Sequence, residues 1–305
     1  MSARLAICLI LAWPLSGCGA APARPDLTPV AELPEHYREL WRAWLDEAPD
    51  WNERRAACLK EDAARTFLVE NLAAVLLGSY ARSELAAHTS ARHGLFERAR
   101  AELVILGEAS VPTLMELHLI GDGATAFLTS EVLMSIGVPA IPACLASMDR
   151  PEEQSRRRAV NLLGQLPYGY DLEPEVRTAL AACLAQDGDW LVRKTAAAAI
   201  ARRGGRDSNL YPARNALARA LHDSDEGVAG EAAMGLASLQ DPRAVPDLIK
   251  FLQRAEQASA FRLYRVGQEA LQLLTQTEDR RSVKGWGGWY RDWLAERKKT
   301  RDSGN

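Results

Sequence analysis

The sequence has 305 residues, of which 48% are hydrophobic, and it carries a formal net charge of −3. This hydrophobic content is normal for a globular protein, so we expect disorder only at the ends of the chain. With 37 basic residues against 40 acidic ones, the charge balance argues against a nucleic-acid binder, which needs a basic stripe.

Residues 1–17 are organised as an export signal. Arg4 precedes the apolar run of residues 5–15, which is too short to span a bilayer, and Leu15-Ser16-Gly17-Cys18 follows it. This tetrad resembles the lipobox of bacterial lipoproteins. The resemblance implies cleavage before Cys18 and a diacylglycerol on its sulfur. The alternative is an ordinary signal peptide with a chance cysteine. We find no later apolar stretch that is long enough to span a membrane.

Residues 18–34 are rich in proline and alanine and are interpreted as a tether. Enteric lipoproteins use Asp after the lipidated cysteine for retention in the inner membrane. By resemblance to them, Gly19 favours the outer membrane. We therefore expect a chain that is lipid-anchored to the bacterial cell envelope through Cys18, on the periplasmic face of the outer membrane.

Residues 35–95 are predicted to form an N-terminal helical cap. Tyr37, Trp41 and Trp44 are spaced i, i+4, i+7, which places them on one face of a helix. An array of helices has two exposed ends, and each end needs a helix that is apolar on its inner face and polar on its outer face.

A repeat occupies residues 96–280. The apolar positions Val192, Ala196 and Ile200 recur 36 residues later, and each set steps by four, which lines one helical face. The acidic residues before each set suit a helix N-terminus. The recurring set, a third copy and two looser copies are Val228, Ala232, Leu236; Val266, Ala270, Leu274; Leu103, Gly107, Val111, Pro112; and Leu133, Gly137, Ile141, Pro142.

Each repeat is predicted to be a helix, a short turn and a second helix that often opens with proline, as at Val111-Pro112 and Val245-Pro246. Alternating β-branched runs are absent, so we expect an all-α chain. A regular period of this size indicates a stacked array.

The pattern Asp-x-x-Val-Arg-x-x-Ala at residues 189–196 resembles HEAT repeats, and most closely the short HEAT-like repeats also found in phycobilin lyases. The resemblance implies a right-handed α-solenoid with helical caps. Ala229 stands where the family carries arginine, so we expect its ladder of charges to be broken there. Tetratricopeptide repeats are the alternative fold, but their Trp and Pro landmarks do not recur in register.

Residues 281–297 are predicted to be a C-terminal capping helix, and residues 298–305 a flexible tail. Trp286, Trp289, Tyr290 and Trp293 share one helical face. We expect at least two of the three tryptophans to be buried against the helix of residues 266–274. A carbohydrate or peptide site is the alternative use of these rings.

A search for chemistry yields no catalytic, cofactor-binding or metal-binding residues. His88 and His93 are interpreted as loop residues, and His118 and His222 as cations at helix C-termini. Residues 121–126 fit Gly-x-Gly-x-x-Ala but follow a helix, so we expect a turn. The cysteines outside the signal and the lipobox are predicted to be free thiols. Two of them, Cys144 and Cys183, are expected to be buried in second helices.

We therefore expect a membrane-tethered scaffold that binds a protein or peptide through second helices lining its concave face, with no enzymatic activity, cofactor or nucleic-acid partner. One alternative is a lyase-like or other enzyme on a HEAT-like scaffold. The other is a purely structural envelope protein.

Overall fold

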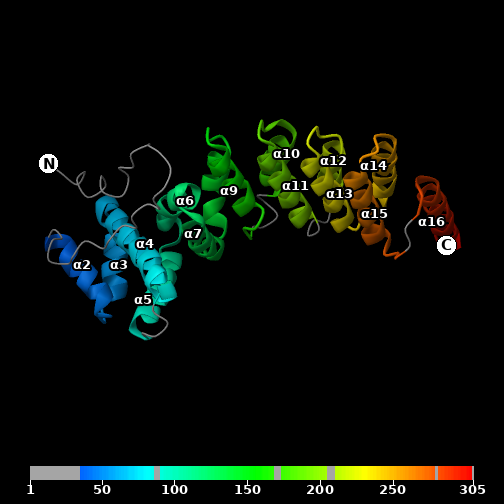
Figure 1. Ribbon diagram of the computed structural model, residues 1–305. Helices are drawn as coiled ribbons and strands as arrows, with labels where there is room; N and C mark the ends of the chain where they lie inside the picture. The colour runs from blue at the N-terminus through cyan, green and yellow to red at the C-terminus, as the bar shows by residue number, and fades with distance from the viewer. Residues whose placement is uncertain (1–34, 86–89, 168–172, 205–209, 279–280, 304–305) are drawn as a thin grey trace, which may run out of the picture. The chain divides into compact units, whose positions relative to one another are not determined.

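The computed structural model describes residues 35–85, 90–167, 173–204, 210–278 and 281–303. Within these ranges the chain forms α-helices and short 3-10 helices and no strand (Figure 1). The chain divides into two compact units, residues 1–143 and 144–305, each of which is described by itself. The fold is an all-α solenoid, as expected. The predicted domain boundaries remain predictions, and residues 1–34 with Cys18 lie outside the described residues.

Among its described residues, the first unit is built from seven α-helices and two 3-10 helices. The last α-helix continues across the division between the two units. The helices are α2 (Glu35–Leu45), α3 (Trp51–Cys58), α4 (Asp62–Leu85), α5 (Ser90–Leu106), η2 (Gly107–Ser110), α6 (Val111–Ile120), α7 (Gly123–Ile136), η3 (Val138–Ala140) and α8 (Ile141–Ser147).

The aromatic face of α2 packs inward, as its spacing predicts. Trp41 and Trp44 are buried, and the ring of Tyr37 stacks on that of Phe67 in α4. Arg98 of α5 lies over the Trp44 ring and donates hydrogen bonds to the carbonyl oxygens at the end of α2. The rings therefore fill the core of the unit and are not presented to a ligand.

The two looser repeat copies have the same backbone geometry. Gly107 and Gly137 both adopt positive φ, +56° and +76°, a conformation that residues with a side chain rarely adopt. Gly107 begins one 3-10 turn and Gly137 directly precedes another. Each turn leads into a helix with proline at its second position. The recurrence at an offset of 30 therefore reflects a repeated turn.

The expectation that no apolar stretch after the signal could span a membrane is wrong by length and composition. The helical stretch of residues 94–120 is long and apolar enough among the described residues. However, it is α5 and α6 joined through η2, with the positive φ of Gly107 between them. Leu103 and Leu114 in it are fully buried, so the stretch serves as core of the first unit.

The second unit is an array of helix pairs in two rows. The first row contains α9 (Glu153–Leu163), α11 (Trp190–Gly204), α13 (Glu226–Ser238) and α15 (Phe261–Thr275). The second row contains α10 (Glu173–Gln186), α12 (Tyr211–Ala220), α14 (Val245–Gln257), which follows η4 (Pro242–Ala244), and α16 (Val283–Ser303).

The periodic residues of the first row form the core. Val192, Ala196 and Ile200 are buried in α11, and their counterparts in α13 have no exposed surface. In α15, Ala270 and Leu274 are buried, whereas Val266 is half-buried. The prediction of one shared apolar face is confirmed for two copies and holds in part for the third.

Small residues allow the first-row helices to approach closely. A Cβ added at Gly164, the last residue of the α9 turn, would lie 2.6 Å from Ala199 Cβ of α11. A Cβ at Gly235 in α13 would lie 3.1 Å from Ala201 Cβ of α11. In the second row, by contrast, α10 and α12 meet through fewer residues. The expectation that the second helices line the concave face stays a prediction.

The close approach can be tested with two glycine substitutions. Gly164→Ala should destabilise the protein by about 1–3 kcal/mol, because the added methyl group overpacks the contact with Ala199. Gly287→Ala in α16 should stabilise it by up to about 1 kcal/mol, because a Cβ there meets nothing within 4 Å and alanine is the better helix former. Urea unfolding of both variants measures the difference. Equal effects would show that the first row is not tightly packed.

Candidate functional site

The turns that enter α11 and α13 are built around aspartates. Asp189 Oδ1 accepts hydrogen bonds from the backbone N–H groups of Leu191 and Val192, both at 2.9 Å. Asp225 Oδ1 accepts equivalent bonds at the start of α13 from Gly227, at 2.8 Å, and from the following residue. These bonds satisfy donors that a helix N-terminus leaves unpaired, which confirms the expected role of the acidic residues.

A second aspartate in each turn receives an arginine from the preceding first-row helix. Arg156 of α9 donates two hydrogen bonds to Asp187, at 2.8 and 2.9 Å. Arg193 of α11 donates two to Asp223, both at 2.8 Å. We call these two pairs the arginine–aspartate ladder. Paired, two-point contacts of this kind are among the stronger polar interactions, because both partners are charged and their geometry is fixed.

The ladder shifts the titration of its carboxylates. The two hydrogen bonds from Arg193 lower the pKa of Asp223, and this outweighs the opposing effect of burial. Burial alone would raise the pKa of Asp187, but the hydrogen bonds from Arg156 and from the Asp189 backbone N–H leave it lowered. Both carboxylates are therefore held in the charged form.

The ladder ends at α13, as predicted. Ala229 occupies the position in α13 that Arg193 occupies in α11, and its side chain is buried. The next repeat also lacks the capping aspartate, since Ala260 precedes α15 and makes no side-chain cap. The two complete rungs thus hold together α9, α11 and α13 and the turns between them.

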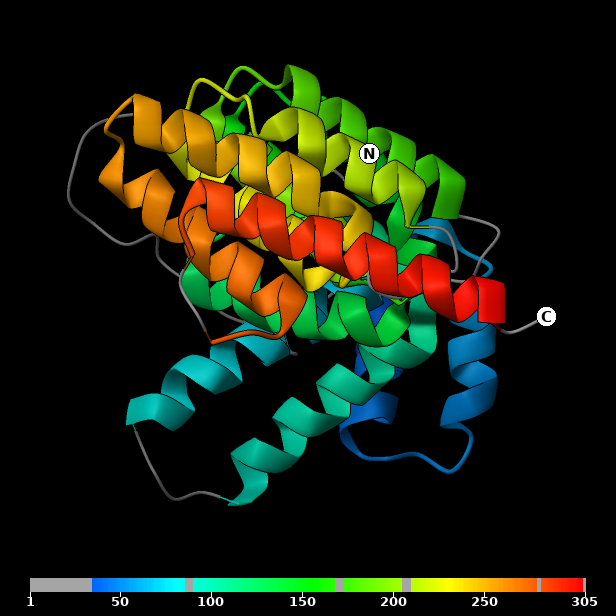
Figure 2. The same cartoon turned by 90° about the vertical axis from the view of Figure 1, so that its right-hand side faces the viewer.

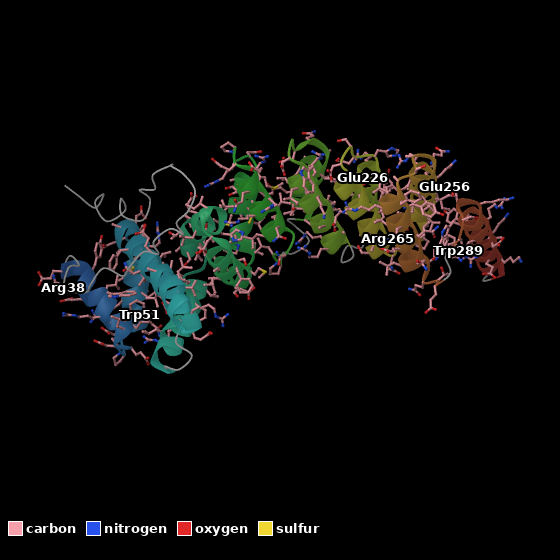
Figure 3. The ribbon with its side chains drawn as sticks, viewed as in Figure 1. Arg38, Trp51, Glu226, Glu256, Arg265 and Trp289 are labelled. Carbon is pink, nitrogen blue, oxygen red and sulfur yellow. The ribbon has the colours of Figure 1, made fainter. Side chains whose placement is uncertain are left out.

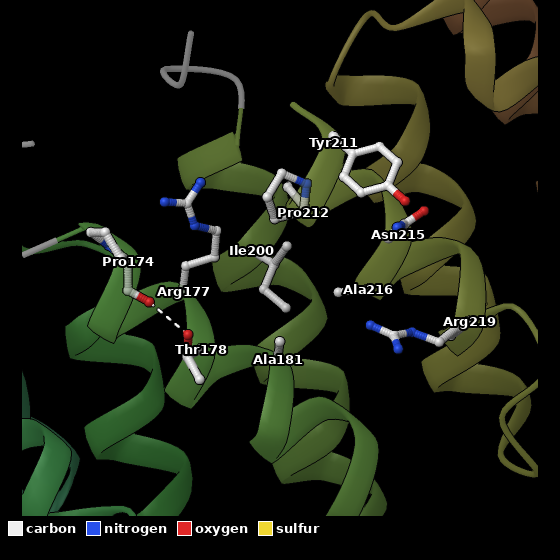
Figure 4. Close-up of a pocket in the computed structure, with 11 residues that line it drawn as sticks. Pro174, Arg177, Thr178, Ala181, Ile200, Tyr211, Pro212, Asn215, Ala216 and Arg219 are labelled. Atoms are coloured by element: carbon white, nitrogen blue, oxygen red, sulfur yellow. Dashed lines mark hydrogen bonds between the residues drawn. The ribbon is translucent and has the colours of Figure 1, made fainter. Parts of the chain in front are cut away.

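A groove lies in the second row, between α10 and α12 (Figure 4). Its main cavity has a volume of about 480 Å³, and a second cavity of about 220 Å³ adjoins it through shared residues. The floor is apolar and consists mainly of short side chains. The floor residues are Ala181, Ile200, Ala213 and Ala216 in the main cavity and Ala185 and Ala220 in the second.

The groove stays open because mainly short side chains line it. Leu180 of α10 and Leu217 of α12 are buried and line neither cavity, so they support the helix pair from within. The apolar lining of the two cavities is mostly alanine, with Leu184 and Ile200 as larger side chains. Short side chains at a supported helix pair leave room for the side chains of another molecule.

The charged groups lining the main cavity are both cationic. Arg177 projects from α10 and Arg219 from α12, and Figure 4 shows the Arg219 guanidinium directed back toward Ala216. Tyr211 and Asn215 add polar groups from α12, and the Tyr211 ring is held by Arg214, whose guanidinium carbon lies 5.4 Å from the ring centroid. The lining suits a ligand with an apolar part and an anionic or hydrogen-bonding part.

Most groove residues were not singled out from the sequence; Ile200 was predicted as a core position and His222 as a helix-terminal cation, and neither was assigned to a groove. The signal that could have found them is the alanine-rich composition of two successive proline-opened helices, α10 and α12. Alanine in a helix is also a common propensity choice, so composition alone does not indicate an open groove.

The aromatic cluster of α16 is only partly a cap. Trp286 is fully buried, and its Nε1–H donates a 3.0 Å hydrogen bond to Gln268 Oε1 of α15. Trp289, labelled on α16 in Figure 3, and Trp293 are half-buried and stack on each other, so the expectation of two buried tryptophans is wrong. The reason is that α16 packs mainly on α14 of its own row and reaches α15 through few residues, among them Trp286.

Two histidine predictions also need correction. His118 lies in the last turn of α6 but is buried, and its Nδ1 donates a 2.9 Å hydrogen bond to the Ala126 carbonyl of α7, which joins two helices. At the end of α12, beside His222, Arg254 of α14 donates a hydrogen bond to the carbonyl oxygen of Leu221. The cation at this helix end is therefore Arg254.

His93 lies in α5 and not in a loop, and His88 lies outside the described residues. The turn predicted at residues 121–126 is confirmed, with the Asp122 side chain capping α7 through the Thr125 N–H.

The cysteines of the described residues are free thiols. Cys144 is buried, as expected, whereas Cys183 is half-buried, so its predicted burial is wrong; Cys58 is also buried. Burial raises the pKa of Cys144 and of Cys183 to about 12. At neutral pH these thiols are protonated, and the reactive thiolate form is not available.

The comparisons with known proteins agree with this fold. Residues 178–266 match the family model described as HEAT repeats. The complex of CpcE and CpcF of phycocyanin lyase from Nostoc sp. PCC7120 is a similar solved structure, with a TM-score of 0.43 and 22% identity. The match covers 52% of this chain and 98% of that one. No curated protein matches the chain. Residues 178–266 are therefore similar to HEAT repeats, within a chain whose described residues form an all-α solenoid.

The expectation that the chain is not an enzyme is corrected by this comparison, because the similar structure is named as a phycocyanin lyase. A HEAT-like array without a recognised catalytic motif therefore does not exclude catalysis. At 22% identity the similarity concerns the fold alone and does not bring the lyase activity to this chain.

The contribution of the ladder can be tested with Asp223→Asn. We expect a loss of about 1.5–3 kcal/mol at pH 7, because the buried Arg193 loses a charged acceptor. In the wild type, Asp187 and Asp223 have lowered pKa values, so their contribution is complete above about pH 4, the unfolded-state pKa, and is lost as the pH falls below it.

Urea unfolding at pH 7, 4 and 3 measures both effects. The Asn variant should lose less stability than the wild type between pH 4 and pH 3. Asp149→Asn, an exposed aspartate in the turn before α9, is the control and should resemble the wild type. If the wild type and Asp223→Asn lose the same amount, the ladder does not stabilise the folded chain.

Proposed function

We propose that this chain is a HEAT-like scaffold, held at the bacterial envelope through a lipid on Cys18, that binds a protein or peptide partner in the groove between α10 and α12. The groove itself is the observation that carries the proposal. Its main cavity of about 480 Å³ falls within the usual range of ligand pockets.

The groove is lined for a segment of polypeptide. Apolar side chains of such a segment would contact the alanines of the floor, and Arg177 and Arg219 would pair with carboxylates or carbonyl oxygens. The adjoining cavity extends the same surface along the two helices toward their C-terminal ends, past Arg219 to His222. An elongated surface of this kind favours an extended or helical segment over a compact molecule.

The ladder supports binding by fixing the walls of the groove. Asp187 follows α10 and Asp223 follows α12, so the two rungs hold the ends of both helices to the first row. A binding surface that is already ordered loses less conformational entropy when its partner binds.

A second candidate is a lyase-like or other enzymatic function on the same scaffold. It is favoured by the name of the similar structure, a phycocyanin lyase. Incubation of the purified chain with phycocyanin, followed by visible absorption, tests it. A change in the pigment absorption that depends on the chain would favour this candidate over binding alone.

Occupation of the groove can be tested by filling it. Ala181→Trp places a large ring in the main cavity, and we expect recovery of the partner from envelope extracts to fall at least about tenfold, as for loss of a central contact. Ala182→Trp adds the same ring at an exposed neighbouring position outside both cavities and should bind as the wild type does. Thermal unfolding of both variants should match the wild type. Equal recovery with both variants would place the partner elsewhere.

Anchoring is tested separately. Cells supplied with an alkyne fatty acid should label the wild-type chain and not Cys18→Ala, because only the cysteine sulfur and the new N-terminus accept the acyl groups in the proposed processing. The variant should also leave the membrane fraction. Equal labelling of the two chains would contradict lipidation while leaving the binding proposal open to its own test.

A further inference from the structure

The C-terminal helix α16 differs in charge from the rest of the chain. Its 21 residues contain six lysines and arginines and three acids, a net charge of +3. Because the whole chain carries −3, the remaining residues carry −6. The cationic charge is thus concentrated on one helix at one end of the second unit.

Three of these cations form a stripe along the helix. Lys284, Arg291 and Lys298 are seven residues apart, close to two full helical turns, so their side chains leave the same side of α16. All three are exposed. We call Lys284, Arg291 and Lys298 the basic stripe.

The basic stripe is not neutralised within the described residues. No ion pair there involves Lys284, Arg291 or Lys298. The repeat arginines are arranged differently, since Arg156 and Arg193 are each paired with an aspartate. The cations of the ladder serve the fold, whereas those of the stripe are available to another surface.

Apolar and aromatic groups border the basic stripe. Leu294, three residues from Arg291, lies next to it on the helix and is 46% exposed, and Tyr290 is half-buried at its flank. Trp293, two residues from Arg291, lies on the opposite face, where Arg297 covers its ring at 4.7 Å from the centroid. Exposed cations beside an exposed leucine and a tyrosine are typical of helices that lie in a membrane interface.

The stripe side of α16 is open. A Cβ at Gly287 or Gly288 would meet no atom within 4 Å. The helix has 21 residues against 13 in α14, on which it packs, so about 12 Å of helix extends past its support. Figure 2 shows its C-terminal end projecting beyond α14.

We infer that α16 binds the surface of an anionic phospholipid membrane, with the basic stripe on the headgroups and Leu294 at the interface. The helix is held in the protein by Trp286, which is buried and bonded to Gln268, so it can bind without leaving the unit. This contact goes beyond the proposed scaffold function and does not depend on the lipid at Cys18. The rest of the chain carries a net charge of −6. This charge repels a long polyanion such as a nucleic acid more strongly than it repels a surface that only one helix touches.

Co-sedimentation with vesicles tests the inference. The purified full chain is mixed with vesicles of phosphatidylcholine alone or with 30% phosphatidylglycerol, and bound protein is measured. We expect at least about tenfold stronger binding to the anionic vesicles, reduced by 0.5 M salt, since each cation near such a surface strengthens binding several-fold. Arg291→Glu/Lys298→Glu should abolish the difference between the vesicles.

The matched control reverses one arginine and one lysine elsewhere. Lys60→Glu/Arg262→Glu changes the total charge by the same amount at two exposed positions outside α16, one in the turn after α3 and one in α15, and should bind as the wild type does. If the first pair lowers the melting temperature, Arg291→Gln/Lys298→Gln gives an intermediate loss without the reversed charges. Apolar binding by residues 5–15 would be the same for all variants and both vesicles. Equal binding to both vesicles by the wild type, or equal loss in the two pairs, would overturn the inference.

Discussion

The second unit depends on how closely its first-row helices can approach. Glycine and alanine stand where α9, α11 and α13 meet, and at Gly164 there is no room even for a methyl group. The short spacing between these helices sets the position of every turn that enters them. It therefore brings the guanidinium group of one repeat within hydrogen-bonding distance of the carboxylate in the next. With larger residues at these contacts, Arg193 would be held away from Asp223, and the ladder would not form.

The groove lies in the second row, where the helices pack less closely than in the first. Its walls, α10 and α12, are the second-row helices whose following turns carry the two complete rungs. Past Ala229 the ladder and the aspartate cap are both missing, and the first residue of α15, Phe261, is 84% exposed. The groove therefore lies in the part of the array where the most interactions between repeats fix its walls, which is where a preformed binding surface is expected to persist.

Local patterns in the sequence predict this architecture well. Helical spacing identifies the buried faces of α11 and α13, the acidic turns identify the caps, and a single departure from the motif at Ala229 locates the end of the ladder. Each of these features depends on residues within one repeat or at a constant offset. The failures concern contacts between elements that no spacing encodes: α16 packs mainly on α14 and touches α15 through few residues, which leaves Trp289 and Trp293 half-buried. The groove is a further case, since it is defined by side chains that are short, and alanine serves both to pack helices and to leave space between them.

Net charge is informative only after paired and unpaired charges are separated. The composition places 37 basic residues against 40 acidic ones, which describes an almost balanced chain. In the structure, arginines such as Arg156, Arg193 and Arg214 are largely buried in pairs with aspartates and present little field to a partner. Lys284, Arg291 and Lys298 of α16 are exposed and take part in no such pair within the described residues, so a small set of basic residues presents unpaired charge on this helix. A chain that is acidic overall can therefore present one basic helix to an anionic surface, while its remaining negative charge limits the contact to that helix and so orients the protein on the surface.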